Sequence, residues 1–399
     1  MKKILSASIL CLFSVCAFSE TAEPAIGIPA KKTDAVTKSI IPEPIPRPTP
    51  KPIPKPGLAK AKDIEIVFVV DTTGSMGGLI QGAKTKIWNI VNDILQHQKK
   101  GTKVKIGLVA YRDRGDEYVT QITGLSENLD DVYSTLMAFQ ARGGGDEPED
   151  VRRALHESVN SIQWSKTRKN LSKIIFLVGD ARPHTDYNDY PTTVETAKSA
   201  KKNGIIINTI QCGKLRETDK YWREIAQYAG GEYFAIPQDG GTKTISTPYD
   251  EELTGLSRKL DEKYIPYGKV AEQKRTYSVR KATADRMAAE APAEAMASRA
   301  YNKSINAYSY SKDDLVQAIE NKTISLEDIK ENELPLEMQK MSKEEQKKYV
   351  ENMIKERKEI REKIKSISKK RDTYIKDNTK EPRSSFDAAV SEALKKQIK

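Results

Sequence analysis

Hydrophobic and polar positions alternate along residues 63–265 in the way expected of strands interleaved with helices. The run Ile64–Val70 is almost wholly apolar, which is typical of a strand buried on both faces. In the segment that follows, apolar residues from Ile80 to Ile94 share one face of a helix. Repetition of this order predicts an α/β fold, a doubly wound and mostly parallel sheet with helices on both sides. The other expected strands are 104–111, 118–122, 173–178, 205–211 and 232–236, and the other expected helices are 129–140, 148–162, 191–203, 218–229 and 249–262.

The alternation ends near residue 265. Residues 266–310 are rich in alanine and short polar side chains, which predicts a low-complexity linker, either a loose helix or without fixed structure. Residues 311–399 form a charged α-helical tail. Its longest helix has apolar residues on alternating three- and four-residue steps, interrupted by Arg357 and Arg371, which indicates coiled-coil-like packing. Three pairs have the spacing of a helix-capping box: Ser311 with Asp314, Ser325 with Asp328, and Ser342 with Glu345.

The first residues have the pattern of an export signal. Two lysines precede an apolar run that is too short to span a bilayer, and Ala17-Phe18-Ser19 is an acceptable cleavage site. We therefore expect a signal peptide over 1–19, a proline-rich linker over 20–62, and a periplasmic or secreted location. Lipid attachment at Cys16 is the less favoured alternative. Cleavage would leave Cys212 as the one cysteine, expected to be a small buried residue.

The net charge of the chain indicates which kinds of partner to expect. The formal net charge of the 399 residues is +11, and it falls to +9 when Lys2 and Lys3 leave with the signal. For an exported protein we expect no nucleic acid, and anionic lipid, polysaccharide or acidic protein surfaces come first as partners of a basic chain. Residues 340–372 hold 13 Lys or Arg against 7 Asp or Glu, but the two signs are mixed along the helix.

Hard oxygen ligands gather at the predicted strand ends. Asp71, Thr73 and Ser75 follow the first buried strand, and Asp180 follows the strand over 173–178. The carboxyl ends of parallel strands meet at one edge of a sheet, so these side chains should converge. The glycine turn Gly143–Gly145 leads into Asp146 and supplies a further acid. Oxygen donors of this kind suit Mg²⁺, with Mn²⁺ or Ca²⁺ as alternatives, better than zinc or copper.

These segments together resemble the von Willebrand factor A domain family. The resemblance lies in the run from Phe68 to Met76, the run from Gly107 to Asp113, the triple-glycine turn, and the run from Phe176 to Asp180; it covers about half of the chain. It identifies residues 63–265 as a candidate A-type domain.

The resemblance also implies a use for the ion. In the family's metal-ion-dependent adhesion site, the hydroxyls of Thr73 and Ser75 would bind the ion directly. Asp71 and Asp180 would act mostly through water, and a partner's carboxylate would take the open place. Thr73 departs from the commoner serine but keeps the hydroxyl. Asp146 stands where many members have threonine, and it either strengthens metal binding or occupies the open place.

The function expected from these features is that of an exported binding module, without enzymatic activity, which contacts a protein partner through its metal ion. Two alternatives stay open. A metal-assisted hydrolase would need a general base, for which Glu147, Glu149 or His184 are candidates. Binding of envelope lipid or glycan by the basic helical tail is the second alternative. A further acidic loop, with Asp113, Asp116 and Glu117, is either ligand-facing or simply solvated.

Overall fold

The structure is a computed structural model that describes residues 63–98, 102–145, 147–241, 245–310, 313–379 and 384–398. These residues belong to one unit of the chain, Pro54–Lys399. The expected signal peptide, the proline-rich linker, Asp146 and Ser311 lie outside the described residues. Within the ranges given above, no helix is both long enough and apolar enough to cross a membrane.

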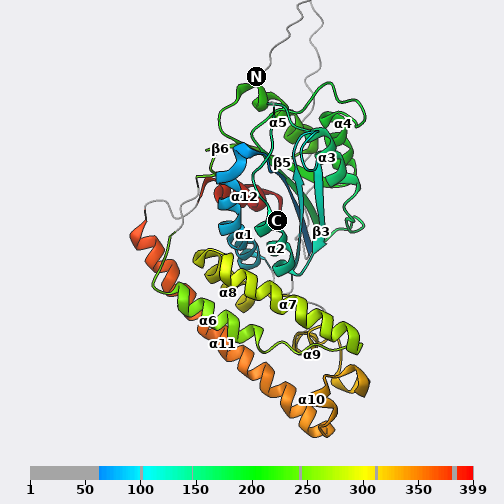
Figure 1. Cartoon of the computed structure of the whole chain (residues 1–399), viewed down its shortest axis with the longest axis vertical. Helices are drawn as coiled ribbons and strands as arrows, with labels where there is room; N and C mark the ends of the chain where they lie inside the picture. Colours follow the sequence, from blue (N-terminus) through cyan, green and yellow to red (C-terminus); the bar gives the residue numbers. More distant parts are fainter. Residues whose placement is uncertain are drawn as a thin grey trace, which may run out of the picture. The chain divides into compact units, whose positions relative to one another are not determined.

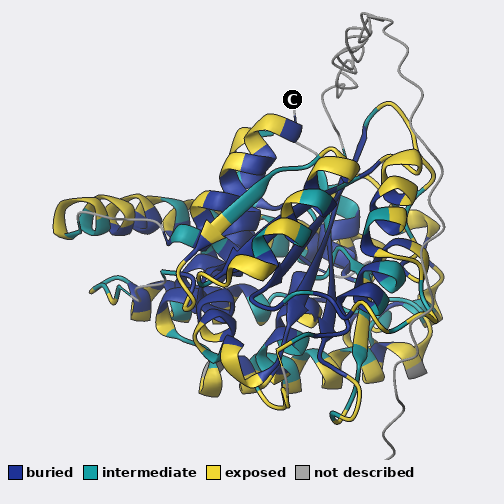
Figure 2. Cartoon of the chain, turned by 90° about the horizontal axis from the view of Figure 1, so that it is seen from above, coloured by how far each residue is buried: buried dark blue, intermediate teal, exposed yellow. Residues whose placement is uncertain are grey.

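A six-stranded sheet in the order β3-β2-β1-β4-β5-β6 forms the centre of the structure. Neighbouring strands are parallel except β2 and β3, which are antiparallel. The central strands β1 and β4 are buried along almost their whole length, which explains their continuous apolar runs. Figure 2 shows the central strands in the colour of buried residues between helices whose outer sides are exposed, whereas the edge strands β3 and β6 are less buried. The strands are β1 (Asp63–Asp71), β2 (Lys103–Tyr111), β3 (Thr120–Ser126), β4 (Leu171–Gly179), β5 (Ile205–Cys212) and β6 (Tyr233–Ile236).

Helices cover both faces of the sheet, so the doubly wound α/β prediction is confirmed. Side chains of α3 and α5, including Trp222, pack with Val67 and Val69 on one face. Side chains of α1, α2 and α12 pack with Phe68 and Phe176 on the other face. The segment after β1 forms the short 3-10 helix η1 (Gly74–Met76). The helices of this part are α1 (Gly77–His97), α2 (Leu129–Ala138), α3 (Val151–Asn160), α4 (Thr193–Lys202), α5 (Arg216–Ala229) and α6 (Asp250–Asp261).

The structure differs from the linker predicted over residues 266–310. This stretch forms α7 (Val270–Glu290) and α8 (Ala293–Ile305), and α8 is buried along most of its length against α1, α6 and α11. The small alanine and serine side chains of α8 allow three helices to approach it closely. Figure 1 shows α6, α8 and α11 running together beside the sheet. The remaining elements are α9 (Leu315–Glu320), η2 (Leu326–Asp328), η3 (Glu331–Glu333), α10 (Leu336–Gln339), α11 (Lys343–Asn378) and α12 (Ser385–Gln397).

The helical tail packs within the same unit of the chain. The long helix α11 contacts α6, α8 and α9. Arg357 and Arg371, which interrupt its apolar register, are both buried and paired with Asp314 and Asp250. The capping box predicted for Ser342 and Glu345 is present at the start of α11. The other two pairs differ: Asp314 itself caps α9, and Ser325 precedes η2 without a side-chain cap.

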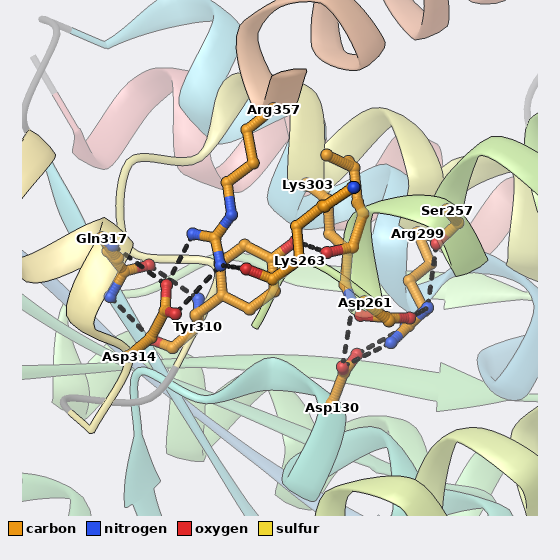
Figure 3. Close-up of polar contacts among 11 residues, drawn as sticks. Asp130, Ser257, Asp261, Lys263, Arg299, Lys303, Tyr310, Asp314, Gln317 and Arg357 are labelled. Carbon is orange, nitrogen blue, oxygen red and sulfur yellow. Dashed lines mark hydrogen bonds and ion pairs between the residues drawn. The ribbon is translucent and has the colours of Figure 1, made fainter. Parts of the chain in front are cut away.

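A chain of buried ionic and polar contacts joins the sheet layer to these helices, as Figure 3 shows. Arg299 of α8 donates to Asp130 of α2 at 2.5 Å and to Ser257 of α6 at 2.9 Å. Lys303 pairs with Asp261. Farther along, Arg357 donates to Asp314 at 2.6 Å. Each buried charge therefore has an opposite charge beside it, as burial requires.

Candidate metal site

The end of β1 holds the centre of the candidate site. Asp71 has no solvent exposure. Its Oδ1 accepts hydrogen bonds from the backbone N–H of Thr73 at 2.8 Å and from the Thr73 hydroxyl at 2.6 Å. The Thr73 hydroxyl lies 3.4 Å from the Ser75 hydroxyl. Asp71 Oδ2 has no hydrogen-bond partner in the described part of the chain. The structure thus brings together Asp71, Thr73 and Ser75, as the sequence predicts.

The end of β4 brings the second carboxylate to the same edge of the sheet. Asp180 is buried, and its Oδ2 accepts a hydrogen bond from Gln238 Nε2 at 2.7 Å. The preceding residue, Gly179, faces β1: a Cβ there would lie 3.1 Å from the Asp71 Cβ and would overlap the Tyr111 hydroxyl. Only glycine lets the two strand ends approach this closely.

The glycine turn lies against the same place. Gly143 and Gly144 have φ of 80° and 86°, which strongly favours glycine. The Gly143 carbonyl accepts a hydrogen bond from the backbone N–H of Gly74 at 3.2 Å. A Cβ on Gly144 would lie 3.4 Å from the Thr73 Cβ. The turn is therefore part of the site, whereas its next residue, Asp146, lies outside the described residues.

Glu149 is the carboxylate whose place the sequence did not indicate, since it was considered only as a base for a hydrolase. It is 3% exposed, and its Oε2 has no hydrogen-bond partner among the described residues. Its Oε1 lies 3.7 Å from the Cβ position of Gly144. An isolated bridge to Pro183 and a hydrogen bond from its backbone N–H to the Arg182 carbonyl hold it at the sheet edge after β4. Its position in the acidic run after the glycines is the feature of the sequence that could have placed it at the site.

Buried carboxylates with too little positive charge beside them raise one another's pKa values at this site. Burial, and then the negative charge of Asp180, raise the pKa of Asp71 to about 7. Burial, followed by the charges of Asp71, Asp113, Asp116 and Asp180, raises the pKa of Glu149 to about 10. Crowded, buried acids of this kind favour protonation or a bound cation.

His184 is engaged with its neighbours at the rim of this site. Its Nδ1 lies 2.9 Å from Asp186 Oδ1, and its Nε2 lies 3.4 Å from Asp113 Oδ2. Its ring stacks on Tyr187 at a centroid distance of 3.9 Å, and the Tyr187 hydroxyl donates to Asp113 at 3.0 Å. Asp113 therefore belongs to a buried cluster next to the candidate site and is not a solvated loop residue.

The donor set fits a hard divalent cation. It consists of carboxylate and hydroxyl oxygens, and two buried carboxylate oxygens, Asp71 Oδ2 and Glu149 Oε2, lack hydrogen bonds from described residues. In the part of the chain that the structure describes, no three His, Cys, Asp or Glu side chains converge so as to hold a metal ion by themselves. A cation here would need the hydroxyls of Thr73 and Ser75 beside the carboxylates.

The part of the chain that holds this site matches a known protein family. The von Willebrand factor A domain family matches residues 65–247. Among curated proteins, an ariadne-like RING finger protein of Acanthamoeba polyphaga mimivirus is 29% identical over 125 residues, or 31% of this chain. The chain spans 12% of the length of that relative.

Solved structures are similar to this chain over less than half of its length. BatB from Bacteroides thetaiotaomicron is 16% identical with a TM-score of 0.34, covering 44% of this chain and 90% of that one. The SpRpn10 VWA domain has the same identity and TM-score, covering 44% and 88%. Proximal thread matrix protein 1 from the mussel byssus, with a zinc-occupied MIDAS motif, is 17% identical with a TM-score of 0.34, covering 46% and 43%.

The family match begins two residues into β1 and ends after β6, so it spans all six strands. It also contains every residue of the candidate metal site. Residues 65–247 of this chain are therefore a von Willebrand factor A domain.

Proposed function

We propose that this A domain holds a divalent cation, Mg²⁺ in the first place, and uses it to bind a protein partner without catalysing a reaction. The observation that carries the proposal is the state of Asp71. This carboxylate is fully buried, is fixed through Oδ1 by Thr73, and has an Oδ2 to which no described residue donates a hydrogen bond. A buried carboxylate is costly unless it is paired or coordinates a metal ion.

The residues around Asp71 have roles that follow from their contacts. Thr73 and Ser75 would supply hydroxyl oxygens to the ion, and Asp180 and Glu149 would supply negative charge at the same edge. Gln238 links Asp180 to the segment after β1, because its amide donates to both Asp180 Oδ2 and the Ser75 carbonyl. The cation supplies the positive charge that an acidic group of a protein partner would bind. Asp146, next to the glycine turn, is the residue that would modulate this contact.

We further propose that the protein is exported and acts in the periplasm or outside the cell. The pattern of residues 1–19 supports export, and the proline-rich residues 20–62 would then separate the A domain from the point at which the mature chain begins.

The first prediction concerns the metal. After treatment with chelator, addition of Mg²⁺ should raise the midpoint of thermal unfolding, because a ligand of the folded state alone stabilises it by about 2.7 kcal/mol at a hundredfold excess over Kd. Asp71→Asn keeps the oxygen that accepts from Thr73 but removes the charge. It should unfold at the same or a higher temperature without metal and gain nothing from Mg²⁺.

Asp63→Asn is the matched control, since it removes a carboxylate from the opposite end of the same strand, where Asp63 pairs with Arg168. It should respond to Mg²⁺ as the unaltered protein does. Equal midpoints with Mg²⁺ and with chelator, or an equal gain in Asp71→Asn, would contradict metal binding. Capture of partners from envelope extracts with Mg²⁺, lost both with chelator and in Asp71→Asn, would extend the result to protein binding.

A further inference from the structure

The loop of residues 237–241, which follows β6, lies against the candidate metal site. Its Gln238 donates hydrogen bonds through Nε2 to Asp180 Oδ2 at 2.7 Å and to the Ser75 carbonyl at 3.2 Å. Asp180 follows β4, whereas Ser75 follows β1, so one side chain joins two of the segments that supply the site.

The carboxamide of Gln238 is also confined from the side of β5. Gly213 follows this strand with a φ of 78°, and a Cβ there would overlap Gln238 Oε1. The Gly213 N–H donates to the Ile236 carbonyl at 2.9 Å, which holds the ends of β5 and β6 together. Only glycine at this position leaves room for the carboxamide that binds Asp180.

Helix α12 holds the same loop from the other side. The backbone N–H of Phe386 donates to the Gly240 carbonyl at 3.2 Å, and a Cβ on Gly241 would lie 2.7 Å from Ser385 Oγ. The Phe386 side chain is buried in the core on the same face of the sheet as Phe68. The start of α12 is thus fixed in the core and in contact with the loop, and Figure 1 shows α12 beside β6.

We infer that Gln238 is a positioning residue of the metal site and that α12, which lies outside the matched residues 65–247, keeps it in place. The inference rests on the proposed function, because it concerns the same divalent cation. Gln238 holds one oxygen of Asp180, so the carboxylate keeps one orientation, and its second hydrogen bond fixes the backbone of Ser75, whose hydroxyl is a proposed ligand. Residues that orient metal ligands through hydrogen bonds contribute about tenfold or more to metal affinity.

Isothermal titration of the full chain with Mg²⁺, after removal of metal by chelator, tests the role of Gln238. Gln238→Met keeps the length of the side chain but loses both hydrogen bonds, so the Kd should rise about tenfold. Gln227→Met replaces an exposed glutamine of α5 and should leave the Kd unchanged. The titration is run well below the unfolding midpoint, where the protein is folded, so a loss of stability alone leaves the Kd unchanged.

A double-mutant cycle tests the role of α12. Gly241→Ala introduces a methyl group against Ser385 and removes no side chain of the site. It should raise the Kd about threefold by displacing the loop. In the Gln238→Met background it should leave the Kd nearly unchanged, because the hydrogen bonds that it disturbs are already absent.

The outcomes separate this inference from the proposed function. An unchanged or lower Kd in Gln238→Met would overturn the role of Gln238. A full threefold rise in the Gln238→Met background, or no effect of Gly241→Ala alone, would overturn the role of α12. If the unaltered protein binds no Mg²⁺, the proposed function fails together with this inference, whereas equal binding by the unaltered protein and Gln238→Met defeats the inference alone.

Discussion

At the residue scale, the carboxylate oxygens of the candidate site differ in whether they have a hydrogen-bond partner. Asp71 Oδ1 is satisfied by Thr73, whereas Asp71 Oδ2 and Glu149 Oε2 lack a partner among the described residues. The sequence indicated Asp71, Thr73, Ser75 and Asp180 because they lie at the end of a buried strand or within the first few residues after it. It did not indicate the place of Glu149, because this residue reaches the site through a single bridge to Pro183 after β4.

The raised pKa values of Asp71 and Glu149 predict how the free energy of unfolding depends on pH. The folded pKa values of Asp71 and Glu149 lie at about 7 and about 10, above their values in an unfolded chain. Ionisation is therefore disfavoured in the folded state, and each group lowers the free energy of unfolding as pH rises above about 4, by roughly 1 kcal/mol per pH unit until its folded pKa is reached. Glu149→Gln removes one of these groups. With chelator present, its stability advantage over the unaltered protein should grow from pH 5 to pH 8.

Urea unfolding at each pH measures this difference. Glu147→Gln is the control, since Glu147 is an exposed acid of the same turn, and its difference from the unaltered protein should stay near zero throughout. An advantage of Glu149→Gln that shrinks as pH rises would show that Glu149 is stabilised in its ionised form.

At the scale of elements, α12 is the helix that the sequence placed least well. It belongs to the charged helical region predicted over 311–399, and the structure packs it on the sheet. Its Phe386 lies 6.3 Å from Phe68, ring centre to ring centre, and Phe68 stacks on Phe176 at 5.4 Å. At the other end of α12, Gln397 and Asn208 of β5 exchange two buried hydrogen bonds. The helix therefore closes the face of the sheet that α1 and α2 leave open.

Removal of the Phe386 ring tests this packing. Phe386→Ala should lower the free energy of unfolding by about 3–5 kcal/mol, because it loses buried area and leaves a cavity above β1. Lys395→Ala, on the exposed side of the same helix, should change it by less than about 0.5 kcal/mol. Denaturant unfolding measures both, and a loss near zero for Phe386→Ala would show that α12 does not pack on the sheet in solution.

At the scale of the whole unit, the A domain and the helix α8 that follows it share buried charges. Asp130 of α2 is paired with Arg299 of α8, which also contacts Asp261 of α6 at 3.1 Å (Figure 3). The Arg299 and Lys303 charges hold the pKa of Asp130 below its usual value despite burial. Such a network links residues that are far apart in sequence, so we expect sheet and helices to unfold together.

Arg299→Ala should lower the free energy of unfolding by about 3–5 kcal/mol, because Asp130 and Asp261 lose the buried arginine that pairs with both and keep Lys303 alone of the two cations. A single transition, seen alike by helical circular dichroism and tryptophan fluorescence, should persist. Arg223→Ala, in an exposed pair with Asp219, should cost less than about 1 kcal/mol. Two separate transitions in the unaltered protein would contradict the shared network.

The sequence by itself determined the α/β sheet and most residues of the candidate metal site, because buried parallel strands appear as apolar runs and their ends place side chains at one edge of the sheet. It also located Arg357 and Arg371 as interruptions in the register of the long helix. Only the tertiary structure decided that these arginines meet Asp314 and Asp250, that residues 266–310 pack as helices, and that α12 covers the sheet. These contacts join residues far apart in the chain, and neither periodicity nor spacing encodes which distant charge or apolar face a side chain will meet.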